Sequence, residues 1–425
     1  MLLERSTLFK SKKEFGSFLL IISVIFIYAT LIEYNNYKNL TQFDSAIISA
    51  TILKQYTKTK QTKKGNTRTY QVLKLKSDNG YKFYTTRGMK FPNSKGKKIT
   101  LEIWAGDISF YQYITIFYAR SVVINVDSSL TNKQKVNLFI ASQHKDEKIT
   151  NIYQALYTAE PLVYELQRRF SYLGISHLFA ISGFHLGVLS GLLFFIFKYP
   201  YKFLQNKLFP YRSYKVDSFM VIAFFLFIYL LFLESPPSLL RAFVMLIIGF
   251  IIYDRGLKVI SIWTLLLTIL LILSLFPRLI LSLGFWLSVI GVYNIFLFLI
   301  YFKHLNKFLQ FILIPIWVYL LMLPYSLYIF SNFSIYHPLS IIWTSLFTIF
   351  YPLSIFFHIM GFGDIFDGIL GNFINLQIDK LSISFGVWWM IGDLVLLLLS
   401  MWKKVFLIMV LIYSILIFIY AVNQF

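Results

Sequence analysis

Hydrophobic and polar positions divide this chain of 425 residues into three regions. An apolar run over 15–32 carries no charged residue, and no small-residue cleavage site follows it, so it predicts a retained membrane anchor. A lysine-rich polar region then extends to about residue 176, and from 177 onward long apolar runs alternate with short polar gaps. The cores of soluble domains of this size cannot hide so many runs, and the pattern therefore predicts a membrane protein.

The apolar runs predict nine membrane-spanning helices after the anchor, about ten in all, and thus a polytopic α-helical membrane protein. The nine are expected over 177–197, 218–234, 237–253, 259–276, 280–302, 308–330, 338–358, 386–402 and 405–422. Residues 361–385 are expected to form an interfacial helix or to dip into the membrane.

The polar region shows two patterns. Short runs rich in β-branched and aromatic residues, separated by Gly, Asn, Asp and Lys, predict a small β-barrel of about five strands. These strands are expected over 46–53, 70–75, 81–86, 100–104 and 114–118. Residues 131–170 have the spacing of amphipathic helices, which we expect to lie at the membrane surface.

Charge changes this picture. The chain has 40 Lys and Arg against 19 Asp and Glu, a net charge of +21, which favours an anionic partner such as nucleic acid or lipid headgroups. Residues 35–125 alone hold 16 basic and 4 acidic residues, interleaved with aromatic rings. Cations for phosphates beside rings for base stacking are typical of single-strand binders. The chain has no cysteine, which excludes disulfides, iron–sulfur clusters and thiolate zinc sites.

The binding residues expected in this region are Lys58, Lys60, Lys63, Lys64, Arg68, Lys82, Tyr84, Lys97 and Lys98. The rings available for stacking are Tyr56, Tyr70, Tyr81, Phe83, Tyr84 and Trp104. A plainer interpretation stays open, in which the aromatic residues fill the barrel and the lysines solubilise it or contact anionic lipid.

Basic residues in the short loops predict the orientation. Thirteen of them fall on one side of the membrane and two, Arg241 and Arg278, on the other, so the first side is expected to be the cytoplasm. The N-terminus is then cytoplasmic and the β-domain extracytoplasmic. The expected regions are an anchor (1–34), a basic β-domain (35–125), amphipathic interfacial helices (126–175) and a transmembrane domain (176–425).

The second span opens with the sequence His-Leu-Phe-Ala-Ile-Ser-Gly-Phe-His-Leu-Gly, whose polar groups are costly in hydrocarbon. His177, Ser182 and His185 are therefore expected to point inward, toward protein or water. A stripe of small residues that recurs every four positions predicts close helix packing. Its members are Gly183, Gly187 and Gly191. The alternative is that the histidines bond only to backbone groups and hold the bundle together.

The turn between the third and fourth spans carries the sequence Glu-Ser-Pro-Pro-Ser-Leu-Leu-Arg. Ser235 is expected to cap the next helix, with Pro236 and Pro237 at its start, so that the positive end of the helix dipole faces this turn. Arg241 would cost about 2.5–3.5 kcal/mol if it faced lipid, which favours an aqueous cavity or an anionic guest. The alternative is an ion pair with Glu234 that closes the hairpin.

These two segments resemble, at matching spacing, the motifs of the ComEC family of competence proteins, the inner-membrane channels of bacterial DNA uptake. The segment Leu283-Gly-Phe-Trp-Leu-Ser288 is similar to that family's weaker Gly-Phe-x-Leu-Ser motif, although Leu281 and Ser282 replace the usual Asp-Pro. The resemblance is specific over 160–295. It implies that residues 35–125 form an extracytoplasmic OB-like domain and that single-stranded DNA passes into the cytoplasm.

The sequence therefore predicts a channel that translocates single-stranded DNA across the bacterial inner membrane during natural transformation, without enzymatic activity, cofactor or metal. The pathway residues expected are His177, Ser182, His185, Ser235, Pro236, Pro237 and Arg241. Gly96-Lys97 lacks the glycine spacing of a P-loop, so the energy is expected from a membrane gradient or a cytoplasmic motor.

Several partners are expected. Many family members carry a metallo-β-lactamase-type domain, but the six histidines of this chain contain no His-x-His-x-Asp-His cluster, so a separate nuclease is expected to degrade the second strand. The other expected partners are single-stranded DNA, membrane lipids, an extracytoplasmic DNA receptor and a cytoplasmic motor or single-strand-binding protein.

Two other functions stay open. An intramembrane serine hydrolase would use Ser182 as nucleophile and His185 as base, but a base one helical turn away is not expected to point at the hydroxyl, and no oxyanion donor is identifiable. A small-solute transporter would be favoured by inverted repeats, which we do not find in the sequence.

Overall fold

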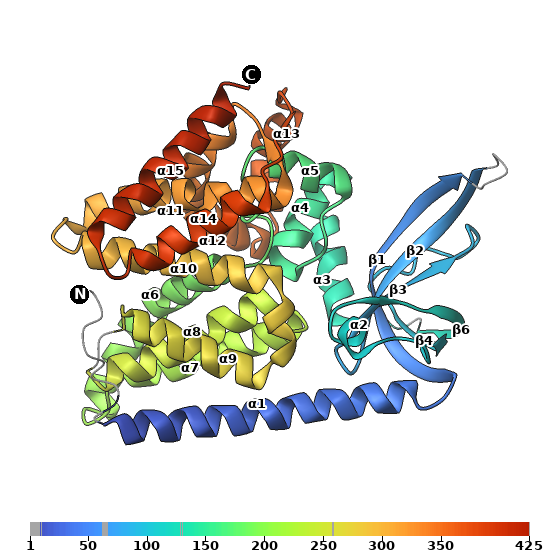
Figure 1. Cartoon of the computed structure of the whole chain (residues 1–425), viewed down its shortest axis with the longest axis horizontal. Helices are drawn as coiled ribbons and strands as arrows, with labels where there is room; N and C mark the ends of the chain where they lie inside the picture. The colour runs from blue at the N-terminus through green and yellow to red at the C-terminus, as the bar shows by residue number, and fades with distance from the viewer. Residues whose placement is uncertain are drawn as a thin grey trace. The chain divides into compact units, whose positions relative to one another are not determined.

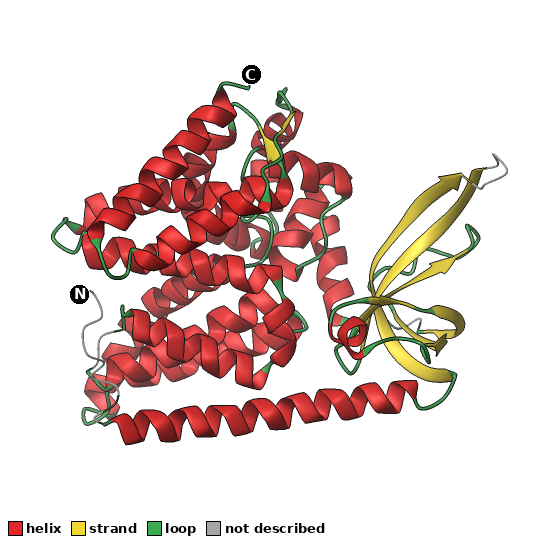
Figure 2. Cartoon of the chain, in the orientation of Figure 1, coloured by secondary structure: helices red, strands yellow, loops and turns green. Residues whose placement is uncertain are grey.

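The computed structural model describes residues 9, 11–61, 67–127, 129, 131–256 and 259–424. These residues form two compact units, one of 16–138 together with 273–282, and one of the remaining described residues. Figure 1 labels the helices and strands, and Figure 2 separates them by type. Each unit is described by itself below.

The α-helices are α1 (Lys12–Thr41), α2 (Phe110–Ile114), α3 (Asn132–Ala141), α4 (Glu147–Thr158), α5 (Tyr164–Tyr172), α6 (Gly183–Leu208), α7 (Tyr214–Phe232), α8 (Pro237–Asp254), α9 (Ile262–Leu275), α10 (Leu283–Tyr301), α11 (Lys307–Phe330), α12 (Ser340–Ile359), α13 (Asp367–Asn375), α14 (Val387–Leu399) and α15 (Lys404–Val422). Short 3₁₀ helices are η1 (Pro277–Leu281), η2 (His337–Leu339) and η3 (Gly363–Phe366). The strands are β1 (Ser45–Gln61), β2 (Thr67–Ser77), β3 (Lys82–Arg87), β4 (Lys98–Trp104), β5 (Phe117–Tyr118), β6 (Arg120–Val126), β7 (Asn332–Phe333) and β8 (Leu381–Ser382).

The first unit contains α1 and a sheet with the strand order β5-β3-β2-β1-β4-β6. The long strand β1 pairs with β2 along 50–61 and with β4 along 45–51. β5 runs parallel to β3, β6 runs antiparallel to β4, and only Ala119 separates β5 from β6. The segment 117–126 thus pairs with β3 at one side of the sheet and with β4 at the other. The core beneath the sheet includes Ile52, Leu73, Leu75, Phe83 and Leu101.

The first four expected strands are present, but the fifth is displaced. Residues up to Ile114 form α2, so the expected strand over 114–118 is wrong for its first half. Ser109 and Gln112 form a capping box that starts this helix, because each side chain bonds to the backbone of the other residue. Strand β5 therefore begins at Phe117, and it is followed by β6, a sixth strand that was not expected.

The second unit is a bundle of apolar helices. α6, α7 and α8 enclose one core, and α9, α10, α11, α14 and α15 enclose another. α4 and α5 pack against α12 and α13, where Ile152 and Phe170 lie in one buried cluster with Tyr351 and Ile374. The position of α4 and α5 at the membrane surface stays a prediction. Residues 361–385 form η3, α13 and β8.

Seven helical segments of the described residues are long and apolar enough to cross a membrane. They are α1, α6, α7, α10, α11, α15 and the segment 337–359 that contains α12, whereas α9 and α14 are shorter apolar helices. The chain is therefore a polytopic helical membrane protein with a β-domain, and the count of about ten spans stays a prediction. α6 starts six residues later than expected, because residues 176–180 form turns and bends and the extended Ser182 is the N-cap.

Candidate functional site

The turn before α6 holds the first motif at the start of the helix rather than inside it. His177 lies between α5 and α6, and Ser182 is the N-cap of α6. The Ser182 backbone N–H donates to Nδ1 of His185 at 3.3 Å, and the Ser182 hydroxyl lies 3.1 Å from the same nitrogen. His185 is buried, and its Nε2 has no hydrogen-bond partner among the described residues.

This contact corrects one expectation. Ser182 and His185 do face each other, because Ser182 precedes the helix and its hydroxyl can turn toward the first turn of α6. Nδ1 has a single lone pair, however, and the backbone N–H of Ser182 already donates to it. No described carboxylate contacts His185 to orient it as a base. The geometry is that of a helix cap, which is the alternative role considered for this histidine.

The turn between α7 and α8 is sharper than expected. Glu234 and Ser235 have φ values of 59° and 54°, so two successive non-glycine residues adopt the left-handed conformation at a cost of roughly 1–2 kcal/mol each. Ser235 does not cap α8, because its backbone N–H bonds back to Leu230 and Pro236 occupies the N-cap position. α8 begins at Pro237, whose side chain lies outside the described residues.

Arg241 is buried in the first turns of α8. Its Cζ lies 5.3 Å from the centre of the Phe285 ring, and its Nε has no hydrogen-bond partner among the residues that the structure describes. Only 4% of the residue is exposed, and in the described part of the chain no carboxylate forms an ion pair with it. The alternative pair with Glu234 is therefore not formed. A cation in this position lacks an anion.

The three motifs meet at one place in the bundle. The Ser238 hydroxyl donates to the carbonyl of Ile181 at 2.7 Å, which joins the start of α8 to the turn before α6. A Cβ on Gly183 would lie 3.1 Å from Cβ of Ala242, so glycine permits this close contact. Phe285, in the third motif, completes the cluster through Arg241.

The glycine stripe makes this close contact only once. No described atom lies within 4 Å of a Cβ built on Gly187 or Gly191, so the helix packing expected there is absent in this structure. Gly191 instead lines a cavity of about 500 Å³ between α6, α7 and α8, together with Lys198, Lys215 and Tyr253.

His177 lies in an unusual environment. Its surface is exposed, yet surrounding protein atoms lower its pKa to about 4, with a backbone hydrogen bond at Gly174 acting in the opposite direction. A pKa this low keeps the ring neutral at pH 7. Its Nε2 lies 3.4 Å from Oγ1 of Thr344 on α12.

His337 was not identified from the sequence. Its Nδ1 lies 3.1 Å from the Tyr319 hydroxyl, and its buried Nε2 has no described partner. Gly174 approaches this ring so closely that a Cβ would lie 2.7 Å from it. The signal that could have found this pair is the glycine itself, three residues before His177, but no local pattern connects it to residue 337.

A basic face runs along the β1–β2–β3 sheet. Paired positions in register place Lys54 beside Lys74, and Lys76 beside Lys82, with Tyr84 next to Lys74. The Lys74 ammonium lies 5.6 Å from the Tyr84 ring. Alternation along the strands extends this face to Tyr56, Lys58, Lys60, Arg68 and Tyr70. We call these ten residues the basic face.

Like charges lie directly opposite each other on this face. The pKa of Lys54 is lowered by burial and then by Lys74 and Lys95, and the pKa of Lys82 is lowered by burial and then by Lys74, Lys76 and Arg278. Such cross-strand pairs destabilise a sheet unless an anion neutralises them.

The structure separates the expected binding residues. Lys58, Lys60, Arg68, Lys82 and Tyr84 lie on the basic face. Lys97 is half-buried and lies outside the basic face. Lys98 forms an ion pair with Asp78 at 2.7 Å. Lys63 and Lys64 lie outside the described residues. Sequence reasoning missed Lys54, Lys74 and Lys76, because only the strand register places them together.

The aromatic residues divide in the same way. Tyr81 and Phe83 are buried in the core beneath the sheet, so these two fill the β-domain as the plainer interpretation expects. Tyr56 and Trp104 are exposed.

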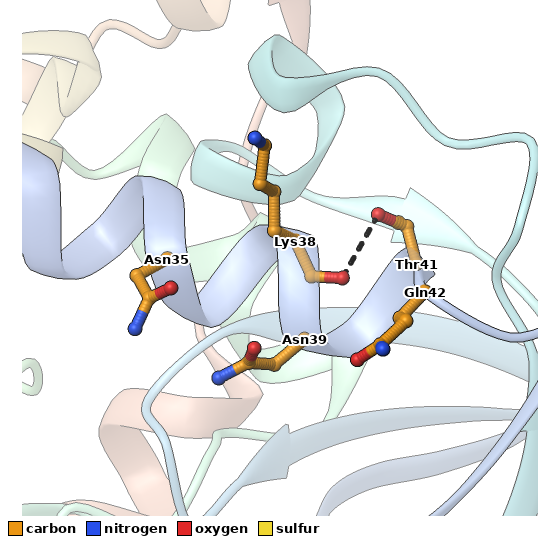
Figure 3. A pocket seen from close by; sticks show the side chains of 5 residues that line it. All are labelled: Asn35, Lys38, Asn39, Thr41 and Gln42. Atoms are coloured by element: carbon orange, nitrogen blue, oxygen red, sulfur yellow. Dashed lines mark hydrogen bonds between the residues drawn. The ribbon is translucent and has the colours of Figure 1, made fainter.

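A second hollow, of about 370 Å³, is formed by side chains at the end of α1 and just beyond it (Figure 3). Its lining residues are Asn35, Lys38, Asn39, Thr41 and Gln42, and the Thr41 hydroxyl donates to the Lys38 carbonyl at 3.4 Å. All five side chains come from this one stretch of chain, so the hollow brings no distant groups together. The described residues also contain no group of three or more ligands that could hold a metal.

The model of a family described as competence protein matches residues 160–425. The match covers the turn before α6, the α7–α8 turn and the start of α10. No curated protein and no solved structure matches the chain.

Proposed function

The chain belongs to the competence protein family and so has a role in DNA uptake, and from this premise we propose that it is a channel for single-stranded DNA in the bacterial inner membrane. In this proposal the N-terminus is cytoplasmic and the β-domain is extracytoplasmic. The basic face collects the strand, and the cluster around Arg241 passes it into the membrane.

The observation that carries the proposal is the lone cation at Arg241. A buried guanidinium without a carboxylate is costly, and here three motifs from distant parts of the sequence assemble around it. A phosphodiester group is the anion that suits it, because a guanidinium binds phosphate through two parallel hydrogen bonds. The neutral imidazole of His177 would offer the strand a hydrogen-bonding group without adding a further positive charge.

The β-domain supports the same function. Its strand order, with one segment pairing parallel to β3 and antiparallel to β4, is compatible with a five-stranded OB-type barrel, in which the face of strands 2 and 3 binds oligonucleotides. The basic face covers this part of the sheet. A strand lying on it would relieve the repulsion between Lys54 and Lys74 and stack bases on exposed rings.

The cavity between α6, α7 and α8 provides the other end of the proposed path. Lys198 and Lys215 lie in segments that the loop charges assign to the cytoplasm. α6 thus has the Arg241 cluster at its start and a basic cavity along its middle. A separate nuclease, a DNA receptor and a cytoplasmic motor remain the partners we propose.

Purified full-length protein in sealed vesicles tests the proposal. A fluorescent single-stranded oligonucleotide added outside should reach the lumen, whereas the duplex of the same sequence should not. Replacing Lys54, Lys74 and Lys82 by Gln should reduce passage, while Lys403→Gln, outside the basic face, should not. Passage of small anions without the oligonucleotide would favour the transporter alternative and overturn the proposal.

A further inference from the structure

A chain of hydrogen bonds ties the turn between α3 and α4 to the end of α12. His144 Nδ1 lies 2.9 Å and 3.0 Å from the two carboxylate oxygens of Asp367. His144 Nε2 lies 3.0 Å from Nε2 of His358, a residue 214 positions away in the sequence. His358 Nδ1 lies 2.7 Å from the carbonyl oxygen of Ser354. The side chain of His144 is completely buried.

These three contacts require three hydrogens. A backbone carbonyl and an ionised carboxylate only accept, so each Nδ1 must donate. Two neutral imidazoles carry one N–H each, and both are used at Nδ1. The two Nε2 lone pairs would then face each other at 3.0 Å, which is repulsive in a buried site. One additional proton converts this repulsion into an N–H···N hydrogen bond.

We propose that His144 and His358 bind one additional proton between their Nε2 atoms, with Asp367 as its counter-ion. The positive charge of the imidazole pair and the negative charge of the carboxylate then cancel. If the proton shifts so that Asp367 becomes neutral and His144 changes tautomer, the number of protons is unchanged. The ligand of this site is therefore a proton, and its binding is independent of the proposed channel function.

The surroundings fit a cation. The Tyr153 ring stacks on His144 with centroids 4.5 Å apart and an interplanar angle of 9°, so its electron-rich face lies on the imidazole. Burial raises the pKa of Tyr153 and of Tyr157, and both phenols stay neutral. The Tyr157 hydroxyl lies 3.3 Å from His358 Nδ1. The charged group in contact with the pair is thus Asp367, from the start of α13.

Gln143 fixes the same two segments beside the histidines. Its amide donates to the His358 carbonyl at 3.1 Å and accepts from the Gly363 N–H at 2.8 Å. A Cβ at Gly363 would lie 2.5 Å from the Gln143 Oε1, so only glycine allows this approach. The shared proton and Gln143 thus both join the α3–α4 turn to the end of α12.

A metal ion fits this site less well. Zinc with tetrahedral angles and Zn–N distances of about 2.0–2.1 Å would separate the two nitrogens by about 3.3 Å. The observed 3.0 Å is a hydrogen-bond distance. The described residues near the pair also supply no third ligand.

The test is the pH dependence of unfolding. The folded protein holds one proton that unfolded histidines release above their usual pKa of about 6.5, so rising pH favours the unfolded state. Between about pH 6.5, where unfolded histidines lose their protons, and the higher pKa of the folded pair, the unfolding constant of the full-length protein in detergent should therefore rise about tenfold per pH unit. His144→Gln should lose this dependence, and the exposed His304→Gln should keep it.

A second measurement covers the case in which His144→Gln does not fold. In protein labelled with ¹⁵N-histidine, Nε2 of the pair should appear protonated at neutral pH, and Asp367→Asn should shift its deprotonation to lower pH because the counter-ion is removed. Two unprotonated Nε2 signals at neutral pH, an unchanged pH profile in His144→Gln, or stability that requires added zinc and is removed by a chelator would each overturn the proposal.

Discussion

Replacing Arg241 by Met should make the protein more stable and less active at the same time. The guanidinium is buried without an anion among the described residues, and an arginine in a membrane helix costs about 2.5–3.5 kcal/mol. Its contact with Phe285 returns about 0.5–2 kcal/mol as a cation–π interaction. Methionine has a similar length and no charge. The free energy of unfolding should therefore rise by about 0.5–3 kcal/mol.

Two assays on the same variant separate stability from function. Reversible unfolding in mixed micelles measures the free energy, and uptake of labelled DNA by a deletion strain carrying the variant measures transport. Arg241→Lys keeps a cation and should retain part of the uptake, although it cannot form the two parallel bonds to phosphate. Loss of stability in Arg241→Met, or normal uptake at normal expression, would refute the assignment of Arg241 to the pathway.

Four further results are expected. Lys74→Glu should weaken binding of single-stranded DNA and reduce the slope of log affinity against log salt by about 0.7 for each phosphate that the variant no longer neutralises, and an unchanged slope would contradict phosphate binding by Lys74. In the wild type the same affinity should fall as the pH rises toward the lowered pKa of Lys54 and Lys82, below their ordinary 10.5, because binding requires charged ammonium groups. Asp393→Asn on α14 should raise stability, since the carboxylate is fully buried and no Lys or Arg of the described residues forms an ion pair with it; a decrease would show that the nearby Tyr325 hydroxyl stabilises the carboxylate in the folded protein. A fluorophosphonate probe should not label Ser182, whereas labelling that His185→Gln removes would favour the hydrolase alternative.

The helices of the bundle could be predicted closely from the sequence, because hydropathy depends on composition within a window. The apolar runs over 308–330 and 405–422 match α11 and α15 within one residue. α1 extends to Thr41, beyond its apolar run, since helix formation continues into polar residues that hydropathy does not count. The prediction of a strand over 114–118 was wrong because the apolar pattern there did not take account of Ser109, whose side chain caps and starts a short helix.

The candidate site could be predicted only where its residues lie close together in the sequence. The turn before α6 and the α7–α8 turn are visible as motifs, but the contact of Arg241 with Phe285 depends on the packing of α8 against α10. His144, His337 and His358 are each isolated in the sequence, and their partners come from other helices. The cross-strand lysine pairs depend on register, which a shift of one residue would destroy.

The distribution of charge explains how one chain could both collect a strand and release it. In the proposed function, the many cations of the basic face would each bind a phosphate weakly, and the exposed ones would be screened by salt, so a strand could slide between them. At Arg241, a single buried cation would bind one phosphate strongly, and several such cations in a row would trap the strand. In the proposed channel, a single strong site could be vacated and refilled as successive phosphates arrive, provided that Phe285 moves away from the guanidinium to admit each one.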